Sequence, residues 1–203
     1  MKETLKIYCQ KAIRILIHQM VSSLKRKISW MQKHWALKTN LVHDAAASVN
    51  LALEYSFSPH WSVELSASAN MWDLPGGFSL KHALAQPELR YWFCDRFSGW
   101  FIDAHAIGGW TPGIGGFWDF SQYYSKFPNL KTFMLKDAIM MGGGIGFGYD
   151  YVLSRHWNLE LELGIGYLYV RGDEYDNDVL LLKGSQFDYI GPTRLGITFC
   201  YLF

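Results

Sequence analysis

The sequence has few cysteines and no long apolar run. Its three cysteines, Cys9, Cys94 and Cys200, are far apart and odd in number. They therefore indicate neither a disulfide framework nor a zinc motif, and we interpret them as free thiols. No stretch approaches the roughly 18 uncharged apolar residues that a transmembrane helix needs. These absences exclude a disulfide-rich scaffold and a helical membrane protein.

Motifs for metals, cofactors and covalent catalysis are also missing. The seven histidines have no paired spacing of the kind that metal ligands show, so we expect no metal site. The nearest candidate, His43 with Asp44, is equally well explained by a tight loop with an Asx turn. The glycines of "MMGGGIGFG" lie in a run of period two that no helix follows, which excludes a dinucleotide-binding loop. No serine lies in a recognisable nucleophile motif, and no cofactor is expected.

Charge is unevenly distributed along the chain. Residues 1–34 carry eight Lys and Arg against one Glu, whereas residues 35–203 carry eleven against seventeen Asp and Glu. Apolar residues in the first segment recur every three or four positions, which predicts a basic amphipathic helical extension over 1–34. A degenerate export signal, a misassigned start and a helix lying on an anionic membrane are the alternatives. A solvated helix face explains the basic residues, so no nucleic-acid partner is expected.

Aromatic residues and glycine are abundant. The chain has 9 Trp, 12 Tyr, 13 Phe and 19 Gly, and this combination favours β structure. From Trp35 onward the apolar pattern has a period of two, as in "WSVELSASANMW" and "NLELELGIGYLYV". These runs have about the length of a tilted strand that crosses a bilayer, roughly 9 to 11 residues.

Eight alternating runs can be counted in residues 35–203. They lie near 35–44, 48–58, 61–72, 84–94, 100–110, 138–153, 157–171 and 188–203. An even number of strands suits a closed barrel, and the links between runs are mostly short on one rim and long on the other. We therefore predict an all-β fold, an eight-stranded antiparallel up-and-down transmembrane β-barrel over residues 35–203, after the helical extension.

Alternation alone leaves open which face of the barrel is apolar, because a soluble lipocalin-like barrel turns its apolar face inward. Three features favour an apolar outside. Along each run, every second position belongs to a polar set, here called the polar parity. This set is rich in Gly, Ser and charges of both signs, which suits a narrow lumen. Trp and Tyr gather at the ends of the runs, as in aromatic girdles. The last run ends on Phe203, which resembles the C-terminal signal recognised by the barrel assembly machinery.

Several segments resemble a known family. "QPELRYWFCDRFSGWF", "GIGFGYDYVLSRHWNLE" and "YIGPTRLGITFCYLF" are similar to segments of an uncharacterised outer-membrane barrel family of Bacteroidetes, domain of unknown function 3575. The resemblance covers about residues 35–203. It implies an eight-stranded barrel in the bacterial outer membrane, and the family carries no agreed activity.

The charged residues of the polar parity are expected to fill the lumen as a neutralising network. They are Lys38, Glu54, Glu64, Glu88, Arg90, Asp103, His105, Asp150, Glu160, Glu162 and Arg194. An eight-stranded lumen is only wide enough for side chains, so we expect no solute conduction. Within this set His105, Asp103 and Glu88 are weak candidates for catalysis, because a carboxylate can orient a histidine that moves a proton.

The sequence thus predicts a small outer-membrane barrel with a plugged polar lumen. Its expected role is structural, or that of an adhesion or assembly partner acting through long outer loops. The expected partners are outer-membrane lipid, the assembly machinery and a surface protein or glycan. Aromatic residues of the longest loop are the candidate contacts for the last of these: Phe117, Trp118, Phe120, Tyr123 and Tyr124. Two alternatives remain open, a lumenal lipid-modifying enzyme and a soluble lipocalin-like binder of a small molecule.

Overall fold

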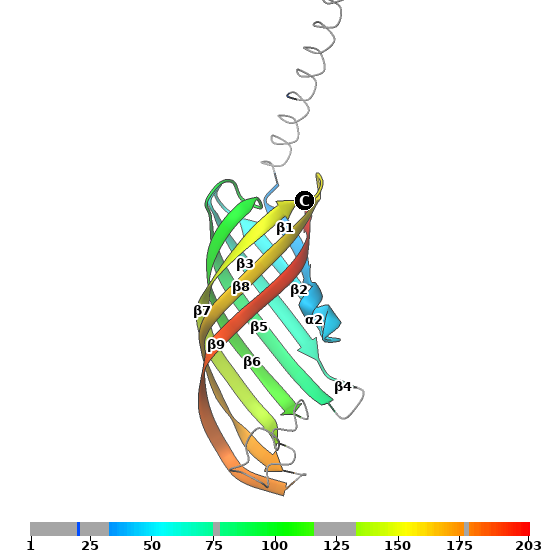
Figure 1. The fold of residues 1–203 in the computed structure, drawn as a ribbon, viewed down its shortest axis with the longest axis vertical. Helices are drawn as coiled ribbons and strands as arrows, with labels where there is room; N and C mark the ends of the chain where they lie inside the picture. The colour runs from blue at the N-terminus through cyan, green and yellow to red at the C-terminus, as the bar shows by residue number, and fades with distance from the viewer. Residues whose placement is uncertain (1–19, 21–32, 75–77, 116–132, 177–178) are drawn as a thin grey trace, which may run out of the picture.

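The structure is a computed structural model of the chain, and it describes residues 20, 33–74, 78–115, 133–176 and 179–203. The described part is a tall antiparallel β-barrel with one five-residue helix on its side (Figure 1). Within these residues, no helix combines the length and apolar character needed to cross a membrane. The expected helical extension over residues 1–34 lies almost entirely outside the described residues.

Nine strands follow one another along the chain. Their bounds are β1 Trp35–Asn40, β2 Val49–Ser56, β3 Trp61–Asn70, β4 Asp73–Leu74, β5 Phe78–Trp92, β6 Gly99–Gly115, β7 Phe133–Val152, β8 Trp157–Asp176 and β9 Val179–Leu202. Eight of them pair with their chain neighbours, and pairing of β3 with β5 and of β1 with β9 closes the ring. The two-residue β4 is an addition that pairs only with β5. The predicted all-β, eight-stranded antiparallel barrel is therefore confirmed.

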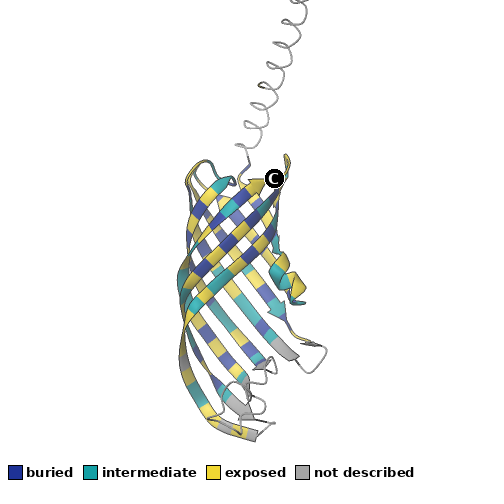
Figure 2. Ribbon diagram, viewed as in Figure 1, coloured by how far each residue is buried: buried dark blue, intermediate teal, exposed yellow. Residues whose placement is uncertain are grey.

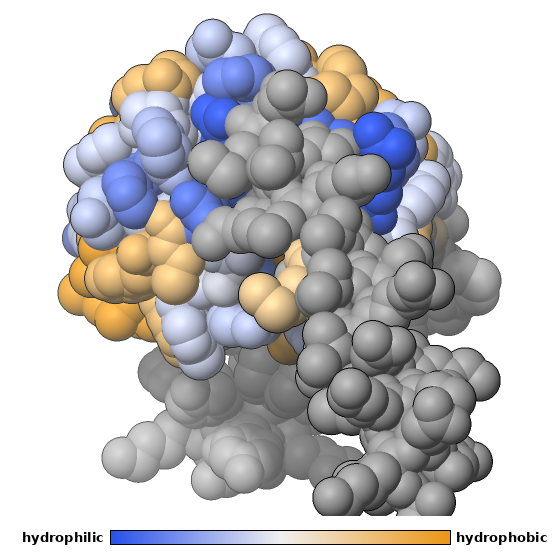
Figure 3. Space-filling model, turned by 90° about the horizontal axis from the view of Figure 1, so that it is seen from above, coloured by the Kyte–Doolittle hydropathy of each residue, from blue (hydrophilic) through white to orange (hydrophobic). Residues whose placement is uncertain are grey.

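Burial alternates along the strands in the half of the barrel that carries the short turns, so that dark and light positions form a chequered pattern there (Figure 2). In β3, for example, Ser62 and Glu64 are buried while Val63 and Leu65 are exposed. The polar parity thus faces the lumen and the apolar parity faces outward. Figure 3, which looks at the end with the short turns, shows hydrophobic residues along parts of the outer edge and hydrophilic residues on other parts of this end.

A ring of aromatic side chains surrounds the end of the barrel that carries the short turns. Each of four neighbouring strand pairs places a Trp directly opposite a Tyr, with ring centroids 4.5 to 5.0 Å apart. Every one of the eight long strands contributes one residue. The pairs are Trp35 with Tyr55, Trp61 with Tyr91, Trp100 with Tyr149, and Trp157 with Tyr201.

Inside the aromatic ring, the same end of the barrel is filled by an apolar plug. Ala36, Trp92, Phe97, Phe101 and Leu202 form one buried cluster. Phe97 comes from the turn between β5 and β6 and has a φ of 56°, a conformation that costs a non-glycine residue about 1 to 3 kcal/mol. Burial of its side chain and a 2.8 Å hydrogen bond from the Asn158 side chain to its carbonyl oxygen offset that cost. The turn residue therefore closes the barrel.

The strands on the opposite side extend farther than the alternation indicated. The segment 172–188 was expected to be a long loop, but β8 continues to Asp176 and β9 begins at Val179. In the same way β7 begins at Phe133 and not near residue 138. The β7–β8 and β8–β9 ladders continue beyond the part of each strand in which one face is apolar and the other is polar. A period-two pattern detects only a strand with two different faces, and so it misses these extensions.

The first link on that side also differs from expectation. The alternating run 35–44 ends as a strand at Asn40, and Leu41–Ala45 form the short helix α2. Asn40 caps this helix by accepting a 3.0 Å hydrogen bond from the Val42 amide. The expected tight loop at His43 and Asp44 is therefore a single capped helical turn.

Candidate functional site

Three cations and five glutamates meet in the middle of the lumen. The register places Glu54 opposite Glu64 and Glu64 opposite Glu88, so three carboxylates form a row across β2, β3 and β5. Like charges in such a row repel one another. The Arg90 guanidinium lies among them and contacts all five glutamates, at 3.4 Å from Glu54, 3.1 Å from Glu64, 2.7 Å from Glu160 and 3.0 Å from Glu162, with the ion pair to Glu88 completing the set.

Lys38 and Arg194 extend this network in two directions. The Lys38 ammonium group lies 2.9 Å from Glu64 and 2.7 Å from Glu160, and also pairs with Glu54. The Arg194 guanidinium lies 2.6 Å from Glu64, 3.1 Å from Glu88 and 2.6 Å from Glu162. Each cation thus joins glutamates from different strands. A network of this kind fixes strand register at the cost of desolvating its charges.

A cavity of about 200 Å³ lies on the side of the network away from the plug. Lys38, Glu64 and Arg194 contribute to its lining, together with polar residues such as Asn50 and Gln86 and apolar residues such as Leu84, Met140 and Tyr189. This mixture suits a small molecule that has both a polar and an apolar part.

Two histidines lie at or beside the cavity. His43 of α2 lines it and exchanges a 2.9 Å hydrogen bond with the Ser68 hydroxyl, which is also 2.9 Å from His82 Nε2. Burial lowers the pKa of His43, and the neighbouring His82 and Arg194 lower it further. His43 is therefore mostly neutral at pH 7, and it presents one hydrogen-bond donor and one acceptor.

A hydrogen-bonded relay of three side chains lies beside the cavity. The His105 ring nitrogen Nδ1 is 2.7 Å from a carboxylate oxygen of Asp103, and Nε2 is 2.8 Å from the Thr193 hydroxyl. Thr193 also lines the cavity. A hydroxyl, a histidine and an orienting carboxylate in this order form the arrangement that activates an oxygen nucleophile.

Local backbone features position this relay. β9 carries a bulge at Thr193, because Pro192 pairs with Ile165 and Arg194 pairs with the preceding Gly164, so Thr193 has no partner of its own. Bulges redirect side chains, and proline tolerates such a position because it has no amide hydrogen to donate. Gly144 and Gly164 leave space for the ring, since a Cβ at either position would be 2.8 Å from a His105 atom.

The charged residues expected in the lumen can now be placed. Ten of the eleven are buried, and Arg194 is about one-tenth exposed along its side chain. Of the three catalytic candidates, the structure brings Asp103 and His105 together. Glu88 is opposite His105 in register, but its carboxylate is engaged by Arg90 and Arg194. The aromatic loop residues Phe117, Trp118, Phe120, Tyr123 and Tyr124 lie outside the described residues.

Thr193 was missed at the level of sequence. The nucleophile motifs that can be recognised in a sequence contain serine, whereas Thr193 lies in "GPTR" within β9. Proline inside a central strand indicates a bulge, so this signal was available. That the redirected hydroxyl meets a histidine from β6, 88 residues earlier, depends on the barrel topology.

These features define a class of protein, a small closed antiparallel barrel whose interior is filled by a charged network. The chain belongs to a protein family of unknown function, DUF3575, whose model matches residues 15–203. This match confirms the resemblance, and it begins within the basic segment that precedes the barrel. No curated protein matches the chain significantly.

Proposed function

We propose that the protein is an integral outer-membrane barrel with a plugged lumen, which acts structurally or as an adhesion or assembly partner. The observation that carries this proposal is the complete ring of alternating Trp and Tyr, one from each long strand. Such aromatic belts mark the interface between membrane and water, where a ring with one polar atom is favoured.

The outer surface next to the aromatic ring supports the same proposal. Large apolar side chains there are exposed on every long strand, including Leu37, Leu53, Leu65, Leu89, Ile102, Ile145, Leu163 and Ile197. A continuous apolar band of this kind in water would make a barrel aggregate, because monomeric soluble proteins rarely expose large apolar patches. A lipocalin-like binder would carry these residues inside, and the lumen holds charges instead.

Fractionation of cells tests the location. The chain should sediment with the membrane, resist extraction by salt, and run faster on a gel before boiling than after, because a closed barrel resists unfolding by detergent. Recovery in the soluble fraction without detergent would contradict the proposal.

A pair of substitutions tests the apolar band itself. Ile145 is 65% exposed in the middle of the band, and Leu182 is 58% exposed on the extension of β9. Ile145→Arg should destabilise the membrane-inserted barrel by about 2 to 4 kcal/mol, whereas the control Leu182→Arg should change it by about 1 kcal/mol or less. The measurement is denaturant unfolding in lipid vesicles, followed by the gel shift. Equal effects of the two substitutions would argue against a lipid-facing band at Ile145.

A second candidate function is a lumenal enzyme that cleaves or transfers an ester-linked acyl chain. The relay from Asp103 through His105 to Thr193 favours it. The Thr193 oxygen would attack the ester carbonyl carbon while His105 takes the hydroxyl proton. His105 would then protonate the departing alcohol, and water would release the acyl group from the threonine ester.

The enzyme candidate predicts a specific pattern of variants. Thr193→Ala and His105→Ala should each reduce release of fatty acid from lipid by at least about a hundredfold, whereas Thr193→Ser should retain activity because it keeps a hydroxyl. The assays are the lipid profile of cells that lack or express each variant, and the gel shift as a control for folding. If the Thr193→Ala barrel folds and the lipid profile is the same as with the wild type, the three side chains of the relay only fill the lumen and catalyse no reaction.

A further inference from the structure

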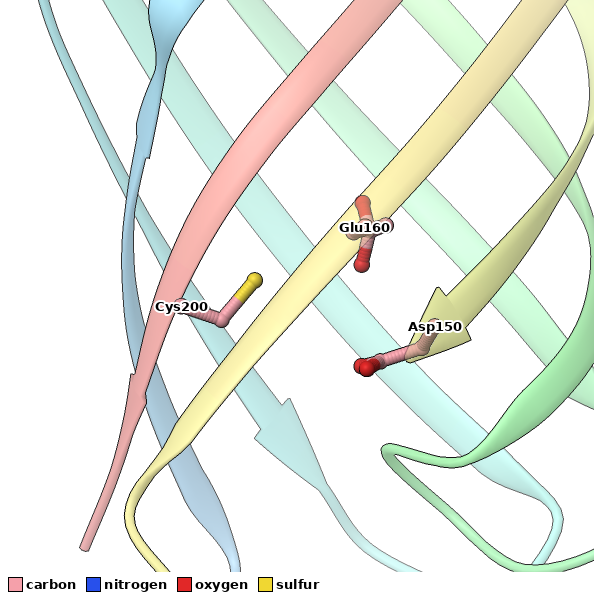
Figure 4. Close-up of side chains that lie close together, drawn as sticks. All are labelled: Asp150, Glu160 and Cys200. Atoms are coloured by element: carbon pink, nitrogen blue, oxygen red, sulfur yellow. The ribbon is translucent and has the colours of Figure 1, made fainter. Parts of the chain in front are cut away.

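A second cluster of polar side chains lies between the charged network and the apolar plug. Asp150 of β7, Glu160 of β8 and Cys200 of β9 come together from three adjacent strands (Figure 4). Their exposed fractions are 1%, 0% and 0%. One potential ligand atom from each residue lies within 4.8 Å of those of the other two.

The barrel register explains why these residues meet. Asp150 is directly opposite Glu160 across the β7–β8 ladder, and Asn158 is directly opposite Cys200 across the β8–β9 ladder. Asn158 and Glu160 are two residues apart on β8, so both side chains face the lumen. The Asn158 amide nitrogen donates a hydrogen bond to the carbonyl oxygen of Phe97.

Among the described residues, four of the seven buried side-chain oxygens without a hydrogen-bond partner belong to this cluster or to the adjacent Asn158. They are both carboxylate oxygens of Asp150, Oε1 of Glu160 and Oδ1 of Asn158. Lys38 and Arg90 contact Glu160 through its other oxygen, Oε2. Among the residues that the structure describes, Asp150 has no cation within ion-pair distance. A buried carboxylate in this position costs several kcal/mol unless a proton or a cation neutralises it.

The charge balance of the lumen favours a cation. Seven carboxylates are buried there, those of Glu54, Glu64, Glu88, Asp103, Asp150, Glu160 and Glu162, against the three cations Lys38, Arg90 and Arg194. If all seven were ionised they would exceed the three cations by four charges, and Asp150 forms no ion pair with any of the three cations, which are shared among the glutamates. A second acidic group, Glu88 with Asp103 and Glu162, lies close to Arg194 and Arg90, which already neutralise two of its members.

We propose that Asp150, Glu160 and Cys200 bind a divalent transition-metal ion of the zinc type. The Cys200 thiol indicates the class of ion, because thiolate ligands bind zinc and similar transition-metal ions in preference to magnesium and calcium. On binding, Cys200 loses its proton to solvent and the thiolate sulfur bonds to the metal. The ion ties β7, β8 and β9 together next to the plug. This proposal does not depend on the proposed function.

The expectation of no metal site rested on the scattered histidines. The proposed ligands contain no histidine, and they are 10 and 40 residues apart in sequence. Such spacing matches no motif, and only the closed barrel brings the residues together.

Metal analysis of the full-length, detergent-purified barrel tests the proposal. The wild-type chain should retain about one zinc ion after gel filtration, and cobalt in its place should give the near-ultraviolet absorption of a thiolate–cobalt bond. Cys200→Ser should abolish that absorption, and Asp150→Asn should weaken zinc binding at least tenfold. Cys94→Ser is the matched control, because Cys94 is an exposed thiol outside the cluster.

Two results would overturn the proposal. One is wild-type protein with no more zinc than the Asp150→Asn variant. The other is wild-type protein with no thiolate–cobalt absorption, a measurement that does not require any variant to fold. Asp150→Asn is nevertheless expected to fold, as shown by an intact gel shift, because it removes a buried charge while keeping the shape of the side chain.

Discussion

Arg90→Ala is expected to be the most damaging single substitution in the barrel. The Arg90 side chain is fully buried and contacts five glutamates, whose mutual repulsion it offsets. Breaking one buried ion pair from one side costs about 3 to 5 kcal/mol, and total stabilities are about 5 to 15 kcal/mol. Loss of the shared cation should therefore prevent most of the protein from reaching the closed barrel.

The measurement for Arg90 is the fraction of heat-shifted protein on a gel, combined with the urea midpoint of tryptophan fluorescence. Arg171→Ala is the matched control, because Arg171 is exposed on β8 outside the charged network, and its midpoint should stay within error. Arg90→Lys should fall in between, since one ammonium group cannot make the several directed contacts of the guanidinium fork. An unchanged midpoint for Arg90→Ala would mean that the glutamates are protonated and need no cation.

The second large effect is expected from Gly144→Ala on β7. A Cβ at this position would be 2.8 Å from both His105 Nε2 and the Thr193 hydroxyl, and it would also meet the backbone oxygen of Ile165. The side chains could rotate away, but the backbone oxygen belongs to a paired strand. Overpacking of this kind costs about 1 to 3 kcal/mol. The same change should separate His105 from Thr193 and so break the relay.

Gly108→Ala on the neighbouring strand β6 provides the control for Gly144. A Cβ there would have no atom within 4 Å, so the substitution should be neutral or slightly stabilising. Urea unfolding of the two variants should differ by at least about 1 kcal/mol in midpoint-derived stability. If Gly144→Ala and Gly108→Ala were equally stable, the lumen beside His105 would have space for a methyl group at position 144.

Alternation of side chains was sufficient to predict the barrel, because one face of each central strand is apolar and the other polar. In β3 the alternation from Trp61 to Asn70 correctly predicts both the extent of the strand and which of its side chains face the lumen. The extensions of β8 and β9 carry no such contrast, so residues 172–188 were wrongly predicted to be a loop. Local hydrogen bonding by Asn40 likewise produced a helical turn that periodicity does not show.

The candidate site was only partly predictable, for a different physical reason. Strand parity assigns a residue to the lumen but does not say which residues of other strands it meets there. Asp103 and His105 are two apart on one strand, so their proximity could be predicted. Thr193 reaches His105 through a bulge, and Asp150 meets Cys200 across three strands, so both depend on the register of the closed barrel.

The apolar plug at Phe97 has a directional consequence. Phe97, Trp92 and Phe101 fill the short-turn end of the barrel, so in the described part of the chain the apolar plug and the charged network lie between the cavity and that end. We expect a small molecule that binds in the cavity to enter and leave on the side away from the plug. The two ends of the barrel interior are therefore not equivalent: one is filled by apolar side chains, and the cavity lies on the other side of the charged network.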